Sequence, residues 1–175
     1  MMLQVAGTDQ RRYAQVGVGG RARFFYQAVA GDFADQAQMV AFCDVNQTRL
    51  DYANRLLQAA SGEQVPTYLA QDFDRMVAET TPEAVIVTSI DRTHHRYIVR
   101  AMELGCDVIT EKPMTVDAGK CQQILDAIER TGRTLRVTFN YRYSPYATKV
   151  RELIMNDTVG EVLSVHFEWL LDLKH

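Results

Sequence analysis

Two short segments combine residue types that can carry out chemistry on a bound small molecule. Gly17-Val18-Gly19-Gly20-Arg21-Ala22 has the glycine spacing of a turn whose backbone can approach a phosphate closely. Glu111-Lys112-Pro113 follows a short apolar segment, Asp107 to Thr110. A glycine turn can hold a dinucleotide, but only an ionisable group at the same edge of a sheet, such as Lys112, can act on a bound substrate.

The glycine turn lies between a predicted strand and a predicted helix, which is the context that gives this weak motif its meaning. Gly17 permits the tight turn, Gly19 lets the backbone approach a pyrophosphate, and the small Ala22 lets the helix pack on the strand. Backbone N–H groups at the helix start, where Gly20 lies, would bind the phosphates. These residues therefore predict dinucleotide binding.

Asp44 and Arg21 bear on the choice between NAD and NADP. Asp44 ends a predicted strand roughly twenty residues beyond the turn, where an acidic side chain can accept hydrogen bonds from the adenosine ribose hydroxyls. Arg21 lies at the mouth of the turn and can pair with a pyrophosphate, pair with an adenosine 2′-phosphate, or remain in solvent. We expect NAD as the cofactor, with NADP as the alternative.

Polar residues stand at and after the end of the near-continuous apolar run from Ala84 to Thr88. Thr88, Ser89 and the helix start at His94 would face a ligand that lies across the carboxyl ends of the strands. His94 and His95 are adjacent, so on a helix their side chains point apart, and no third ligand is in sight for a metal. We expect one histidine near the cofactor, the other on the surface, and no metal site.

The elements that must position these residues alternate from Tyr13 to Asn140. Segments of strand length and segments of helical spacing follow one another, the pattern of a parallel sheet covered by helices on both faces. We predict a Rossmann-type, doubly wound α/β domain over residues 1–140, with a six-stranded sheet. The strands identified are Tyr13 to Val18, Gln38 to Cys43, Ala84 to Thr88, Asp107 to Thr110 and Thr134 to Phe139. The helices are about Arg21 to Val29, Asn46 to Gly62, the segment ending at Gly105, and the segment from Thr115 to Gly132.

Residues 141–175 have a different pattern. Ser144-Pro145 is typical of a helix start, with a cap and a first-turn proline. Beyond this helix, apolar residues alternate with polar ones, which predicts a strand with one wet face. The apolar positions are Leu163, Val165, Phe167, Trp169 and Leu171. One helix and one strand cannot bury their own apolar sides, so we expect the beginning of a second domain that is completed by more chain or by association.

Composition excludes several classes of partner. The net charge of -3 and 23% charged residues give no attraction for nucleic acid or for an anionic membrane surface. No window approaches the roughly 18 apolar residues that a membrane helix needs. The three cysteines, Cys43, Cys106 and Cys121, are widely spaced and are interpreted as reduced thiols of a cytoplasmic protein.

Taken together, these segments resemble the Gfo/Idh/MocA family of oxidoreductases. The resemblance runs from about Arg12 to the chain end and implies an NAD(P)-binding Rossmann domain followed by a mostly antiparallel α/β domain. It rests on the glycine turn, Cys43-Asp44-Val45, the stretch from Thr88 to His94, Glu111-Lys112-Pro113, and Phe139-Asn140-Tyr141-Arg142-Tyr143-Ser144-Pro145.

The resemblance implies that Lys112 lies next to the nicotinamide and the substrate hydroxyl. A lysine in such a place can exchange a proton with a carbinol oxygen while hydride moves to or from the ring. The resemblance also implies cofactor contacts for Glu111, Asn140 and Arg142, and a nicotinamide-side wall made by Thr88 to His94.

The chain departs from the family pattern at two places. Ser89-Ile90-Asp91 stands where relatives usually have a Thr-Pro-Asn turn. The family's catalytic Asp and His, four residues apart, would come several tens of residues after Lys112, beyond His175. Asp172 and His175 have the wrong spacing and come too early, so we do not assign them this role.

We therefore expect an NAD(P)-dependent oxidoreductase that acts on a sugar, polyol or related small metabolite, and a homo-oligomer formed through the second domain. Two alternatives remain open: a catalytically inert dinucleotide-binding module, and an NAD-dependent glycosidase of the same family.

Overall fold

The computed structural model describes residues 10–170 of the chain. Contacts divide the chain into two units, Met1–Thr138 and Phe139–His175, which are described separately. Within the described residues, the first unit contains a six-stranded sheet in the order β3-β2-β1-β4-β5-β6, and every neighbouring pair is parallel.

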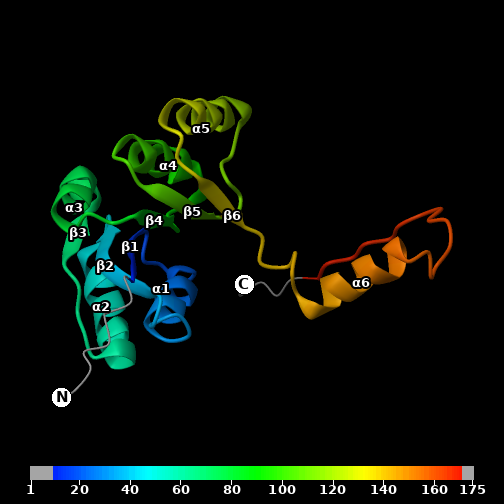
Figure 1. The fold of residues 1–175 in the computed structure, drawn as a ribbon, viewed down its shortest axis with the longest axis horizontal. Coiled ribbons are helices and arrows are strands. Elements are labelled where there is room, and N and C mark those ends of the chain that lie inside the picture. The colour runs from blue at the N-terminus through cyan, green and yellow to red at the C-terminus, as the bar shows by residue number, and fades with distance from the viewer. Residues whose placement is uncertain (1–9, 171–175) are drawn as a thin grey trace, which may run out of the picture. The chain divides into compact units, whose positions relative to one another are not determined.

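The strands of this sheet are short, and the helices connect them in chain order (Figure 1). The strands are β1 (Arg11–Val16), β2 (Ala37–Asp44), β3 (Thr67–Leu69), β4 (Ala84–Val87), β5 (Asp107–Glu111) and β6 (Leu135–Thr138). The helices are α1 (Ala22–Ala30), α2 (Gln47–Ser61), α3 (Phe73–Thr80), α4 (His94–Glu103) and α5 (Ala118–Thr131), with 3-10 turns η1 (Ala70–Asp72) and η2 (Asp91–Thr93).

Two hydrophobic clusters, one on each face of the sheet, form the core. The first joins the strands to α3, α4 and α5, where Met76, Ile98 and Ile124 are fully buried. The second joins the strands to α1 and α2 through Phe25, Leu50 and neighbouring residues. In Figure 1, α1 and α2 lie below the sheet, and α4 and α5 lie above it. All four residues of β4 are buried, as expected for a strand covered on both faces.

Local sequence signals set the ends of several helices. Asn46 caps α2 by accepting a hydrogen bond from the backbone N–H of Arg49, and Gly62 ends that helix in the left-handed conformation. Asp117 caps α5 by accepting a hydrogen bond from the N–H of Lys120. By contrast, α1 follows the glycine turn with no side-chain cap and no acidic residue in its first turn.

The strand order reverses at the centre of the sheet. β1 pairs with β2 on one side and with β4 on the other. At such a switch point the loops after neighbouring strands separate and leave a crevice at their carboxyl ends. The turn after β1, the end of β2, the loop after β4 and the end of β5 all open at this edge.

The Rossmann-type sheet expected from the sequence is therefore present, with differences in detail. β1 ends at Val16, so Gly17 and Val18 belong to the turn rather than to the strand. β3 and α3 were not identified from the sequence. β3 has only three residues, which is too short for an alternating pattern to be recognised.

The second unit contains the helix α6 (Pro145–Met155), capped by the Ser144 side chain, which accepts from the N–H of Ala147. The strand predicted from Leu163 onward is wrong for the residues described, because residues 162–170 form no strand. A strand needs a hydrogen-bonded partner, and the described part of this unit offers only α6. Phe167 and Trp169 stack on each other with ring centroids 6.0 Å apart. Leu171, Asp172 and His175 lie outside the described residues.

None of the helices within residues 10–170 is long and apolar enough to cross a membrane.

Candidate functional site

Gly17 begins the turn at the end of β1, and hydrogen bonds from both of its backbone polar groups hold it in place. Its N–H donates to the carbonyl oxygen of Cys43 in β2 at 2.8 Å, and its own carbonyl accepts from the Thr88 hydroxyl at 2.6 Å. Its φ of +84° is in the left-handed region, and a Cβ at this position would lie 2.4 Å from the backbone nitrogen of Ser89. Only glycine fits here.

Gly19 and Gly20 are different, because a Cβ at either position would meet no atom of the chain within 4 Å, and neither has a left-handed φ. The fold itself does not require glycine at these two positions. The open space lies at the start of α1, whose first N–H groups have no side-chain cap. Uncapped N–H groups beside backbone without side chains are a suitable cradle for a phosphate.

Asp44 connects the end of β2 to the glycine turn and is only 5% exposed. One carboxylate oxygen accepts from the N–H of Val18 at 2.7 Å, and the other accepts from the N–H of Asn46 at 2.9 Å. Each oxygen has a further lone pair that can accept another hydrogen bond. The carboxylate therefore fixes the turn and still has capacity for hydroxyl groups of a ligand.

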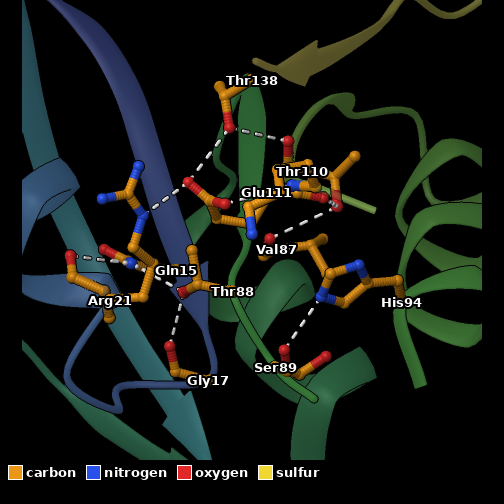
Figure 2. A network of polar contacts seen from close by, with 12 residues as sticks. Gln15, Gly17, Arg21, Val87, Thr88, Ser89, His94, Thr110, Glu111 and Thr138 are labelled. Atoms are coloured by element: carbon orange, nitrogen blue, oxygen red, sulfur yellow. Dashed lines mark hydrogen bonds and ion pairs between the residues drawn. The ribbon is translucent and has the colours of Figure 1, made fainter. Parts of the chain in front are cut away.

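Gln15 is a buried polar residue of β1 that the sequence analysis did not single out. Its side-chain amide nitrogen donates to the Thr88 hydroxyl at 2.9 Å and to the carbonyl of Ala22 at 3.2 Å. Figure 2 shows this amide and the Thr88 hydroxyl between Gly17 and α1. The Thr88 hydroxyl thus holds the turn in place, and the side-chain oxygen of Gln15 is buried with no partner among the described residues. The signal in the sequence that could have identified Gln15 is that it is a polar residue within the otherwise apolar segment from Tyr13 to Val18.

Glu111 ends β5 and has a buried carboxylate with three donors. One oxygen accepts from Nε of Arg21 at 2.7 Å and from the Thr138 hydroxyl at 3.3 Å, a hydroxyl that shares its single proton with the Thr110 carbonyl at 3.1 Å. The other accepts from the backbone N–H of Lys112 at 3.1 Å. Figure 2 shows Arg21 and Thr138 both directed at this carboxylate. Arg21 is therefore paired within the protein, and its guanidinium also lies over the ring of Phe24 at 5.2 Å.

His94 begins α4 and is 1% exposed. Its Nε2 lies 2.9 Å from the carbonyl oxygen of Ser89, and its Nδ1 lies 2.8 Å from the carbonyl oxygen of Pro113. Both ring nitrogens thus face backbone of the loops after β4 and β5. The expected direct contact of His94 with a cofactor stays a prediction, whereas its position between the two loops is a feature of the fold.

His95, the next residue, is partly buried and lies near Lys120 and Asp117 rather than near the loops that His94 contacts. Burial, followed by the charge of Lys120, lowers the pKa of the His95 imidazole. Among the described residues, no three His, Cys, Asp or Glu side chains gather as a metal ion would require.

A pocket of about 250 Å³ lies over the carboxyl ends of β1, β2 and β4. Seven residues expected at the site line it: Gly17, Gly19, Gly20, Arg21, Asp44, Thr88 and Ser89. Ile90 and Thr93 also line it and belong to the stretch from Thr88 to His94 that was expected to form a wall of the site. Sequence reasoning assigned no contact to four further lining residues, namely Val16, Val45, Arg49 and Tyr97, and no residue-type pattern distinguishes them. Next to the pocket, burial raises the pKa of the Cys43 thiol to about 12, so this thiol is not a nucleophile near neutral pH.

The remaining predicted residues lie outside the pocket lining. Ala22 is fully buried under the turn, and Lys112 is exposed after β5. The Lys112–Pro113 peptide bond is cis. Asn140 and Arg142 are exposed residues of the second unit, so their proposed cofactor contacts stay predictions.

Comparisons with known proteins point to one family and one fold. Residues 11–139 match the model of GFO_IDH_MocA, described as an oxidoreductase family with an NAD-binding Rossmann fold. The chain is 39% identical over 111 residues to YteT of Bacillus subtilis, a protein assigned as an oxidoreductase, covering 63% of this chain and 26% of YteT. It is 35% identical over 130 residues to inositol 2-dehydrogenase of Gluconacetobacter diazotrophicus, covering 74% of this chain and 37% of the relative.

A solved scyllo-inositol dehydrogenase from Lactobacillus casei, with NAD(H) and scyllo-inositol bound, superposes with a TM-score of 0.74 at 22% identity. The match covers 87% of this chain and 43% of that structure, and it establishes the likeness in fold. The chain thus spans less than half the length of each of these proteins.

Proposed function

Because the chain belongs to the Gfo/Idh/MocA family of oxidoreductases, we propose that it is the cofactor-binding part of an NAD-dependent dehydrogenase. The substrate would be a sugar, a polyol or a related hydroxylated metabolite. The reaction would convert a hydroxyl-bearing carbon into a carbonyl, or the reverse. Inositol 2-dehydrogenase, a relative of 35% identity, supports this class of substrate.

One observation carries the proposal. The open backbone at Gly19 and a lysine at position 112 lie at the same edge of one parallel sheet, and an ion pair of 2.7 Å between Arg21 and Glu111 joins the two segments. A fold that served binding alone would need the cradle but not the lysine. The combination is what a reaction at a nicotinamide ring requires.

The residues present fit a dinucleotide. Backbone N–H groups at Gly19, Gly20 and the start of α1 would bind the pyrophosphate, where a Cβ would meet nothing of the protein. The free lone pairs of Asp44 would accept from the ribose hydroxyls. Bound NAD would supply the acceptor or donor of hydride. Lys112 would take up or return the proton at the substrate oxygen.

The position of Arg21 supports NAD rather than NADP. Its guanidinium is held at the end of β5 by Glu111, whereas the ribose contact Asp44 ends β2. In this sheet β2 and β5 are three strand spacings apart, which is about 14 Å at about 4.8 Å per spacing. Arg21 is therefore not available to a 2′-phosphate beside Asp44, where the carboxylate would repel that phosphate.

Titration of the purified chain with NADH and NADPH tests the proposal. We expect saturable binding of NADH, followed by the enhancement and blue shift of its fluorescence, and much weaker binding of NADPH. Absence of NADH binding at millimolar concentration would refute both the dehydrogenase and a glycosidase that depends on NAD.

If NADH binds, incubation with NAD and a panel of inositols, glucosides and aldoses separates the remaining functions. Formation of NADH, measured at its absorbance maximum, supports the dehydrogenase. Sugar release without net NADH supports a glycosidase, and binding without either product supports an inert module.

Association and location are part of the same proposal. The exposed apolar residues of the second unit, such as Leu163 (87% exposed) and Val165 (83%), favour association of chains through that unit. Sedimentation equilibrium of the chain would test this. The three cysteines form no disulfide, which favours the cytoplasm, and cell fractionation would test that.

A further inference from the structure

The carboxylate of Glu111 is the only group among the described residues that contacts both the helix of the glycine turn and the backbone of Lys112. One carboxylate oxygen accepts hydrogen bonds from Arg21 at the start of α1 and from Thr138 at the end of β6. The other oxygen accepts a hydrogen bond from the backbone N–H of Lys112. Its side chain is 6% exposed, whereas that of Arg21 is 45% exposed.

A buried carboxylate is stable only when its charge is compensated by donors. All three donors of Glu111 come from segments that border the site, so its position defines theirs. If Glu111 moves, Arg21 loses its ion-pair partner among the described residues and the Lys112 N–H loses its acceptor. The carboxylate therefore connects the phosphate cradle mechanically to the lysine.

The segment of Lys112 is also held on its other side. The carbonyl of Pro113 contacts His94, whose second ring nitrogen contacts the carbonyl of Ser89 in the loop after β4. Two buried side chains, Glu111 and His94, thus fix the backbone immediately before and after Lys112. The lysine side chain itself remains exposed and free to meet a substrate.

A similar pair at the opposite end of β5 gives a matched comparison. Asp107 begins β5 and accepts from Arg11 at 2.6 Å and from the N–H of Thr134 at 3.0 Å. Asp107 and Glu111 therefore both join β5 to β6 and to an arginine near β1. Only Glu111 contacts residues of the site.

We propose that Glu111 is a positioning residue for Lys112. Through its ion pair with Arg21 it sets the distance between the lysine and the cofactor bound at the glycine turn. The proposal rests on the proposed function, since it gives Lys112 its role, but its structural part can be tested without turnover.

The first test uses hydrogen exchange in the full 175-residue chain labelled with [¹⁵N]lysine. The chain has four lysines, Lys112, Lys120, Lys149 and Lys174, so the spectrum is simple, and Lys112→Arg identifies the signal of interest. We expect the Lys112 amide to exchange about tenfold faster in Glu111→Met, which removes both acceptor oxygens. Glu111→Gln retains one acceptor and should give a smaller acceleration, and Arg21→Gln should accelerate exchange while Glu111 remains in place.

Asp107→Asn is the control, because it makes the same carboxylate-to-amide change as Glu111→Gln on the same strand. Its Lys112 amide should exchange within about twofold of the wild-type rate, after correction for any change in global stability measured by urea unfolding. Equal acceleration in Asp107→Asn and Glu111→Gln would overturn the proposal. Unchanged exchange in Glu111→Met would overturn it as well.

NADH binding, measured on the same samples, distinguishes failure of the proposed function from failure of the positioning role. Wild-type chain that fails to bind NADH contradicts the proposed function, whatever the exchange data. Wild-type chain that binds NADH, with a Lys112 amide insensitive to Glu111, contradicts only the positioning role. In a preparation that turns over, Glu111→Gln should lower kcat about tenfold and change the KM for NAD less than threefold, since the lysine is misplaced while the cradle is retained.

Discussion

Gly17 and Gly19 are two residues apart in one turn, yet the structure predicts opposite consequences for an alanine at each. At Gly17 the φ of +84° costs a residue with a Cβ about 1–2 kcal/mol. The new methyl group would also lie 2.4 and 2.5 Å from Ser89 backbone atoms and 2.6 Å from Thr88. Overpacking of a well-packed site typically costs about 1–3 kcal/mol.

Gly17→Ala should therefore lower the free energy of unfolding by about 2–5 kcal/mol, a large part of the roughly 5–15 kcal/mol of a typical domain. At Gly19 a Cβ meets no atom within 4 Å and φ is not left-handed. Gly19→Ala should therefore change stability by less than about 0.5 kcal/mol. Its methyl group would stand where a pyrophosphate approaches the backbone.

The loss at Gly19 should appear in binding. Hydrogen bonds to a charged group contribute about 1.5–3 kcal/mol, so their loss would raise the Kd for NADH by about 10- to 150-fold. Urea unfolding followed by circular dichroism gives the stabilities, and NADH fluorescence gives the Kd. A Gly19→Ala chain that binds NADH as tightly as wild type would refute the phosphate cradle. A Gly17→Ala chain as stable as wild type would refute the close packing of the turn on Ser89.

Three further changes follow from the site. Lys112→Ala should keep the Kd for NADH within about threefold and, in protein that shows dehydrogenase activity, lower kcat at least about 100-fold, because general acid–base groups contribute a rate factor of about 10²–10⁴. An unchanged kcat would contradict the role of Lys112 in proton transfer. Asp44→Ser should relax the preference for NADH over NADPH about tenfold, as measured by the two Kd values, and should also lower the melting temperature because the N–H of Val18 loses a charged acceptor. For His95, burial lowers the pKa of the imidazole below its ordinary 6.5, so the unfolded chain takes up a proton more readily than the folded chain. The stability that comes from the neutral His95 is therefore complete above pH 6.5 and is lost as the pH falls toward the pKa of the folded state. His95→Gln should make the melting temperature fall less steeply between about pH 7.5 and 5.5.

Much of the fold follows from patterns that act over a few residues. The run from Ala84 to Val87 is apolar throughout because β4 is covered on both faces, and this was recognised in the sequence. The cap at Asn46 acts within a single helical turn, so the start of α2 could also be placed. Asp117 was not recognised as the cap of α5, whose start was expected near Thr115. β3 has three residues and depends on pairing with β2, which no local signal reports.

The residues of the site also divide into those that local sequence indicates and those that depend on distant contacts. Gly17 and Asp44 could be assigned because the strand–turn–helix context fixes their places at the sheet edge. The pairing of Arg21 with Glu111 could not, because the two residues are 90 positions apart and either charge has other possible partners. For the same reason Gln15 was missed, since its contact with Thr88 spans 73 positions. Alternation alone also failed in residues 163–170, where no partner strand is present among the described residues.

The parallel pairing of the sheet has a consequence for the order in which the protein is made. The glycine turn is synthesised early, but its packing surface at Ser89 and its tie to Glu111 come roughly 70 and 90 residues later. The Thr138 hydroxyl that completes the Glu111 contacts comes later still. Long-range pairings of this kind form slowly, because the intervening loop must be closed first. During translation the nascent chain therefore lacks these contacts of the glycine turn and of Glu111 until the ribosome has passed β6.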